Sequence, residues 1–157
     1  MKQCFGTILL NALKIWGASW IGGLVSIIPL YIMRGNGVPT PVQNWGSALI
    51  GGLTAAVALF IFFVREGRSG EFRKYAKKEL LLLSVLPSLF WIVVGCLFVK
   101  NNFVILVNAT MFCEAVTGIP VAEYGLLTPL PFALAFGVIY SVAVFLGYWY
   151  GQSHPKW

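Results

Sequence analysis

Charged residues are absent from four long stretches of this 157-residue chain. The uncharged stretches hold 19, 30, 20 and 32 residues and lie between Lys14 and Arg34, Arg34 and Arg65, Glu79 and Lys100, and Glu123 and Lys156. About 20 consecutive apolar residues are enough to cross a bilayer as a helix. Only 10% of the chain is charged and 59% is hydrophobic, whereas a soluble domain carries about a quarter charged residues. The pattern therefore predicts an all-α integral membrane protein.

Four spanning helices are expected, in a single transmembrane domain that covers residues 1–157. Their approximate ranges are 15–33, 45–64, 80–99 and 128–150. Residues 1–14 have apolar side chains on one helical face, so we expect a lead-in that lies at the membrane surface. Residues 34–44 are rich in Gly, Pro and Asn, which is typical of a loop.

The number of spans depends on residues 103–127. This segment begins apolar and then carries Asn108, Thr110, Glu114 and Glu123. In one interpretation, residues 103–117 form an outer re-entrant or interfacial helix, and the bundle has four spans. In the other, residues 101–119 are a fifth span, in which a carboxylate costs roughly 2.5–3.5 kcal/mol at mid-helix. We favour four spans because Glu114 would carry part of that cost.

A basic segment, residues 65–79, separates the second and third expected spans. Six of its residues are basic and three are acidic. Because cytoplasmic loops are enriched in Lys and Arg, we place this segment and the N-terminus in the cytoplasm, with the chain in the plasma (inner) membrane. With four spans, nine basic residues face the cytoplasm and two face the other side, whereas five spans give eight and three.

The second half of the basic segment is amphipathic. Phe72, Tyr75 and Ala76 share one helical face, so we expect this cytoplasmic linker to lie flat on the lipid headgroups. Six residues are candidates for contact with anionic lipid: Arg65, Arg68, Arg73, Lys74, Lys77 and Lys78. The competing interpretation is that these charges only set the topology.

The pattern W-G-x-x-x-I-G-G-L occurs twice, beginning at Trp16 and again 29 residues later at Trp45. Its glycines are Gly17, Gly22, Gly23, Gly46, Gly51 and Gly52. Small residues four apart let helix backbones approach closely in lipid, so we expect these helix faces to pack tightly. Consecutive spans run in opposite directions, so the two copies also suggest an inverted repeat of the kind found in transporters. Helix packing alone is the simpler interpretation.

Glu114 and Glu123 are the acidic residues outside the basic segment. With Asn108 and Thr110 they are candidate ion or substrate ligands, because a desolvated carboxyl group can bind a cation or carry a proton. Solvation of both glutamates at the water interface is the competing interpretation. The three cysteines form no C-x-x-C motif, so we expect no metal site. No catalytic triad or phosphate-binding loop pattern occurs, and we expect no cofactor.

These observations predict a small membrane protein without enzymatic activity. We expect a subunit that associates through its Gly-rich helix faces, either with itself or with a larger membrane complex such as a transporter. Its other partners would be membrane lipids, and no nucleic acid is expected. One alternative is a small oligomeric channel or carrier that uses Asn108 and Glu114, and a lesser alternative is a lipid-modifying enzyme.

Overall fold

The computed structural model of the chain describes residues 2–34, 41–69, 72, 75–98 and 129–154. Within these ranges the structure has four helices: α1 (Lys2–Arg34), α2 (Pro41–Gly67), α3 (Lys77–Phe98) and α5 (Pro129–Ser153). Three of them contain a stretch long and apolar enough to cross a membrane, namely Phe5–Val25, Leu49–Gly67 and Leu134–Ser153. The prediction of an all-helical chain with long apolar helices is confirmed for the described residues.

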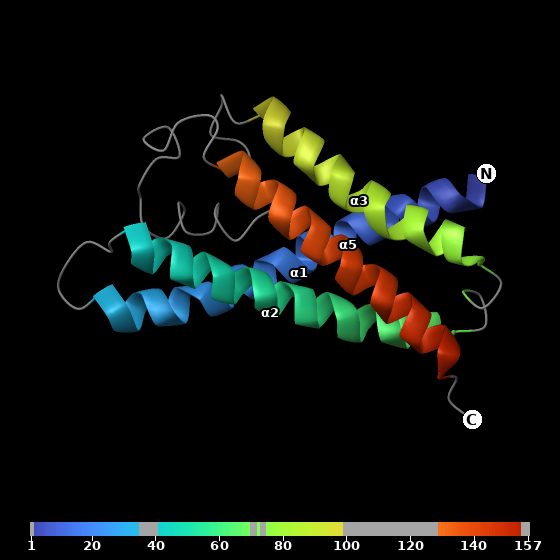
Figure 1. Cartoon of the computed structure of the whole chain (residues 1–157), viewed down its shortest axis with the longest axis horizontal. Coiled ribbons are helices and arrows are strands. Elements are labelled where there is room, and N and C mark those ends of the chain that lie inside the picture. The colour runs from blue at the N-terminus through green and yellow to red at the C-terminus, as the bar shows by residue number, and fades with distance from the viewer. Residues whose placement is uncertain (1, 35–40, 70–71, 73–74, 99–128, 155–157) are drawn as a thin grey trace.

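The four helices pack in a ring, and each runs antiparallel to the described helix before it (Figure 1). α1 contacts α2 and α3, and α5 contacts the same two helices. α1 begins, α2 ends, α3 begins and α5 ends at one end of the bundle, on the right in Figure 1. We call this the termini end and the opposite one the distal end.

The helices extend beyond the apolar ranges that the sequence suggested. α1 begins at Lys2, so the expected surface lead-in is the first part of a continuous helix. α2 begins at Pro41 and α5 at Pro129, because the missing N–H of proline costs little in a first helical turn. At the termini end, polar side chains in these extensions bond to other parts of the bundle: Asn11 to α3, Glu66 to α1 and Gln152 to the linker.

The linker between α2 and α3 folds back onto α5. The ring of Phe72 stacks on Tyr148, with centroids 4.9 Å apart and an interplanar angle of 26°. Gln152 Nε2 donates a hydrogen bond of 2.6 Å to the carbonyl oxygen of Phe72, and Tyr75 also packs against the core. At Phe72 and Tyr75, the apolar face that we expected on lipid headgroups therefore rests on the protein.

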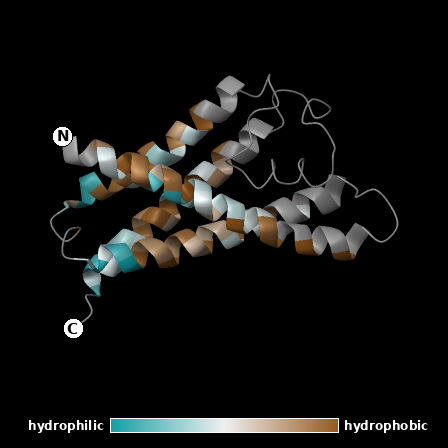
Figure 2. Cartoon of the chain, turned by 180° about the vertical axis from the view of Figure 1, so that it is seen from behind, coloured by the Kyte–Doolittle hydropathy of each residue, from teal (hydrophilic) through white to brown (hydrophobic). Residues whose placement is uncertain are grey.

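The bundle has polar groups inside and a largely apolar exterior. The hydroxyl groups of four buried serines bond to carbonyl oxygens one turn earlier in their own helices: Ser19, Ser84, Ser88 and Ser141. Large apolar side chains such as Leu24, Val57 and Val138 are about 60% exposed (62%, 59% and 63%). Figure 2 shows hydrophilic residues gathered toward the termini end and hydrophobic residues along much of the remaining described helices.

Candidate functional site

Four side chains from three helices form a hydrogen-bonded cluster near the termini end. They are Asn11 and Lys14 of α1, Glu66 of α2 and Tyr148 of α5. Asn11 and Tyr148 are fully buried, and the side chains of Lys14 and Glu66 are only 13% and 21% exposed. We call these four residues the polar cluster.

Glu66 uses both oxygens of its carboxylate. Oε1 accepts a hydrogen bond from the Lys14 ammonium group in an ion pair, and Oε2 lies 3.2 Å from the Tyr148 hydroxyl. Lys14 Nζ also lies 5.5 Å from the ring centroid of Phe62 and 5.4 Å from that of Phe63, which is a cation–π geometry. A poorly solvated carboxylate is stable only beside such a cation, so the two charges depend on each other.

Asn11 compensates for a proline in the middle of α3. Pro87 lacks the N–H that would otherwise bond to the carbonyl of Leu83, four residues earlier. Asn11 Nδ2 reaches from α1 and donates to that carbonyl at 3.0 Å. The amide oxygen of Asn11 then accepts from the Tyr148 hydroxyl at 3.2 Å. Asn11 therefore ties α1 to both α3 and α5.

The Tyr148 hydroxyl has one proton and two neighbouring acceptors. Asn11 Oδ1 and Glu66 Oε2 both lie 3.2 Å from it. Its single O–H can donate to only one of them at a time. The ring itself is held in place by Phe63, at a centroid distance of 4.8 Å, and by Phe72 on the linker. The α1 amide oxygen and the α2 carboxylate therefore share one donor.

Three glycines bring α2 and α5 close enough to form the polar cluster. A Cβ on Gly67 would lie 2.5 Å from the carbonyl oxygen of Tyr148, and a Cβ on Gly147 would lie 2.8 Å from that of Phe60. A Cβ on Gly151 would lie 2.9 Å from the Cα of Gly67. Gly147 and Gly151 have the small-x-x-x-small spacing of tightly packed membrane helices, so the sequence contained a signal for this contact.

The repeated glycine motif lies where α1 crosses α2. A Cβ on Gly22 would collide with the carbonyl oxygen of Gly51 and lie 3.0 Å from the Cβ of Ala55. Gly22 and Gly51 occupy the same position in the two copies of the motif. The two copies therefore face each other inside one chain, and we call this approach the glycine contact.

The other motif glycines have different surroundings. Gly52 faces α5, where a Cβ would collide with the ring of Phe136. Gly23 is buried. Gly17 and Gly46 are open, because a Cβ at either position would meet nothing within 4 Å. Tight approach is thus confined to the second half of each copy.

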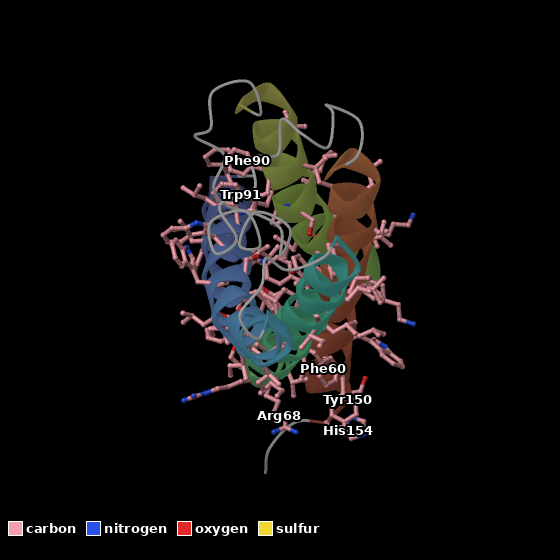
Figure 3. The ribbon with its side chains drawn as sticks, turned by 90° about the vertical axis from the view of Figure 1, so that its left-hand side faces the viewer. Phe60, Arg68, Phe90, Trp91, Tyr150 and His154 are labelled. Carbon is pink, nitrogen blue, oxygen red and sulfur yellow. The ribbon has the colours of Figure 1, made fainter. Side chains whose placement is uncertain are left out.

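Four of the six basic residues expected to contact lipid lie among the described residues. Three of them are exposed at the termini end: Arg65, Lys77 and Lys78. Arg68 is half-buried, and its Nε has no hydrogen-bond partner in the described part of the chain. Figure 3 shows Arg68 where α2 and α5 end, near the stacked rings of Tyr150 and His154. The remaining two, Arg73 and Lys74, are outside the described residues.

The proposed ion or substrate ligands also fall outside the described residues. These are Asn108, Thr110, Glu114 and Glu123, all in the segment that left the number of spans open. In the described ranges, no three His, Cys, Asp or Glu residues come close enough to hold a metal ion. The polar cluster is therefore the site that the structure itself brings together.

The residues of the polar cluster lie far apart in the sequence, and no local pattern connects them. Lys14 and Glu66 are 52 residues apart, and Tyr148 follows Glu66 by 82 residues. Each of the two charged residues has an ordinary interpretation as the boundary of an apolar stretch. One signal was available: Pro87 inside an apolar stretch leaves a carbonyl without its helical donor, and a buried Asn on another helix is a natural partner.

No protein-family model matches this chain, and no curated protein or solved structure is significantly similar to it. The polar cluster must therefore be interpreted from its own geometry. Every member bonds to another group of the bundle, and the charges of Lys14 and Glu66 neutralise each other. Such an arrangement holds helices together and keeps one ion pair partly shielded from water.

Proposed function

We propose that the chain is an integral protein of the plasma (inner) membrane with four spans and a cytoplasmic termini end. The apolar exterior and the mutual hydrogen bonds of the polar cluster support this proposal. In water, large apolar side chains on all four described helices, such as Leu24, Val57 and Val138, would be exposed to solvent, whereas large apolar patches are rare on soluble monomers. In a bilayer the same surface faces hydrocarbon.

The direction of the helices supports an even number of spans. α3 ends and α5 begins at the distal end, so α5 returns to the end where α1 began (Figure 1). At 22 residues, α3 is also long enough to cross a bilayer. An even number places the C-terminus on the same side as the N-terminus, beside Lys77, Lys78 and Arg65.

Reporter fusions at the C-terminus test this topology. With four spans, a fluorescent protein that folds only in the cytoplasm should be bright, and a phosphatase that is active only outside should be inactive. Five spans would reverse both signals. The two reporters check each other, because a chain that fails to insert leaves the phosphatase inactive and the fusion protein soluble.

We further propose that the protein is a non-enzymatic subunit of a membrane assembly. The observation that carries this proposal is the engagement of the cluster's polar groups with one another rather than with an open site. Gly22 and Gly51 contact each other within the chain. Association would therefore use the lipid-facing side chains rather than the Gly-rich faces that the sequence suggested.

Native mass spectrometry of the protein, extracted in lipid nanodiscs from its own host, tests this proposal. A complex of fixed stoichiometry with other polypeptides would support it. The identity of the partner would then indicate the process in which the protein takes part. A defined homo-oligomer would favour a channel or carrier. A bare monomer would overturn the subunit proposal and return attention to a lipid-modifying enzyme.

A carrier is the second candidate, and the ion pair within two apolar helices favours it. Lys14 and Glu66 both lie inside stretches able to cross a membrane, where ionisable groups often mark ion pathways. Proton flux into proteoliposomes loaded with a pH dye should then be lost in Glu66→Gln and kept in the exposed control Glu79→Gln. Wild-type vesicles that leak no faster than empty ones would remove this candidate. A pathway using Asn108 and Glu114 remains a separate prediction.

A further inference from the structure

An apolar groove of about 370 Å³ lies between α3 and α5 on the outside of the bundle. Its floor consists of the buried small residues Ser88, Ser141 and Gly137, with the side chain of Ile92 packed over Gly137. Its walls are larger apolar side chains such as Leu81 and Val138, which are 51% and 63% exposed. The small floor and tall walls leave a channel that runs between the two helices.

Among the described residues that line it, the groove offers hydrocarbon contacts and no available hydrogen-bond donor. The Ser141 hydroxyl donates to the carbonyl of Gly137 at 2.7 Å, and the Ser88 hydroxyl donates to that of Ser84 at 3.5 Å. Both serines are therefore satisfied within their own helices, and every other lining side chain is apolar. A hydrocarbon chain is the ligand that matches such a surface.

The groove is about as long as one leaflet of a bilayer is thick. On α3 its lining runs from Leu81 to Ile92, which at 1.5 Å per residue corresponds to about 16 Å. The hydrocarbon core of a bilayer is about 30 Å thick, so one leaflet is about 15 Å. The groove begins near the termini end and extends toward the distal end, along the part of the bundle that we expect to lie in the membrane.

Two lysines stand at the mouth of this groove. Lys77 and Lys78 are four and three residues before Leu81, so helical periodicity places them on the same side of α3 as the groove lining. Both are exposed. On α5, Trp149 follows the lining residue Phe145 by one turn and is 43% exposed, as is typical of rings at headgroup level. The mouth is therefore positively charged and interfacial.

We infer that this groove binds one acyl chain of an anionic phospholipid of the cytoplasmic leaflet, with its headgroup phosphate at Lys77 and Lys78. The charge of the mouth selects an anionic headgroup, and the length of the groove suits a chain from the same leaflet. The inference rests on the proposed membrane location. It narrows the expected lipid contact from six basic residues to two of them and adds the apolar half of the site.

The test is competitive lipid binding to the full-length protein in detergent, read by native mass spectrometry. Equal amounts of phosphatidylglycerol and phosphatidylcholine with the same acyl chains are added. Wild-type protein should retain one phosphatidylglycerol in preference to phosphatidylcholine. Lys77→Gln and Lys78→Gln should each lower that preference by about fivefold, and together by roughly 25-fold. The matched control is Arg65→Gln, which removes an exposed charge at the same end on α2 and should leave the preference unchanged.

The apolar half of the site is tested by filling its floor. Ser141→Leu should lower the binding of both lipids by tenfold or more without changing the preference between them. The headgroup variants lie outside the helix interface, so the test stands even where Ser141→Leu does not fold. No preference in the wild type, or an equal loss in Arg65→Gln, would overturn the proposal.

Two further measurements distinguish a failure of the lipid site from a failure of the proposed membrane location. Resistance to extraction by alkaline carbonate measures membrane integration independently, so an integrated protein without lipid preference overturns the lipid site alone. A second copy of the chain is the rival occupant of the groove. Efficient disulfide cross-linking through Val138→Cys, with the three native cysteines replaced by serine, would assign the groove to that copy and overturn the lipid site.

Discussion

The glycine contact and the polar cluster both hold α1 against α2, but they do so in opposite ways. At Gly22 and Gly51, side chains are absent and the two backbones touch. At Lys14 and Glu66, two long side chains meet and carry opposite charges. The first contact is steric and tolerates no added atom, whereas the second is electrostatic and tolerates no missing partner. One pair of helices thus depends on two different kinds of complementarity.

The glycine contact also reveals what the sequence repeat does. Gly22 and Gly51 are equivalent positions in the repeat, and they meet because they lie about equally far along α1 and α2 from the connection between these antiparallel helices. Gly52 faces Phe136 instead, because α2 lies between α1 and α5 in the ring. A near-identical pattern therefore serves one shared contact and, on α2, an additional one.

The largest expected effect comes from removing one partner of the ion pair. Glu66→Leu leaves the Lys14 ammonium group without its counter-charge in a poorly solvated position, and we expect a loss of about 3 kcal/mol in the free energy of unfolding. Lys14→Met combined with Glu66→Leu removes both charges and should recover most of that loss. Unfolding in mixed dodecyl maltoside and dodecyl sulfate micelles, followed by tryptophan fluorescence, measures both. A double variant as unstable as Glu66→Leu would refute this account of the cluster.

A single added methyl group should break the glycine contact. Gly22→Ala places a Cβ against the backbone of α2, which cannot move aside as a flexible side chain would, and we expect a loss of about 2 kcal/mol. Gly17→Ala is the matched control on the same helix, because a Cβ there meets nothing. It should stabilise by about 0.5–1 kcal/mol through helix propensity. Equal effects of the two substitutions in the same unfolding assay would mean that the close approach is unimportant.

The role of Asn11 as a substitute donor can be isolated with Pro87. Asn11→Leu leaves the Leu83 carbonyl without a hydrogen-bond donor. It should lower the free energy of unfolding by about 1.5 kcal/mol, within the range for a buried unsatisfied group. Adding Pro87→Ala restores the helical N–H to that carbonyl and should return part of the loss. Thermal denaturation of both variants in detergent, followed by circular dichroism, measures this. If Pro87→Ala lowers the midpoint of thermal denaturation further in the Asn11→Leu background, then Asn11 does not stabilise the protein by bonding to the Leu83 carbonyl.

The smallest effect is expected from the shared hydroxyl. Tyr148→Phe keeps the ring contacts with Phe63 and Phe72 and loses only the O–H, so we expect a cost of about 1 kcal/mol. Tyr150→Phe, at an exposed position two residues later, should change stability by less than about 0.5 kcal/mol. The same micelle unfolding experiment compares them. A cost above that of Glu66→Leu would place the tyrosine, rather than the ion pair, at the centre of the cluster.

Local patterns predicted the helices well and their ends less well. Uncharged stretches indicated where α1, α2, α3 and α5 lie, because burial in lipid or in a bundle excludes isolated charge. The same rule placed the start of the first helix too late, since it treated Lys14 as a boundary. In the structure Lys14 is inside a helix that begins at Lys2. A charge with a partner can lie at a poorly solvated position of a helix, where an unpaired charge would be costly.

The amino-acid sequence by itself determined the helical class, the apolar surface and the two glycine patterns that permit close packing. These follow from composition and spacing along one chain, which a helix converts directly into faces. Only the tertiary structure decided which faces meet: Gly22 with Gly51, Asn11 with the carbonyl freed by Pro87, and Lys14 with Glu66. The reason is physical, because hydrogen bonds and ion pairs act over a few ångströms in space. The order and direction of the helices set the distances between side chains on different helices. These distances cannot be derived from residue spacing in the sequence.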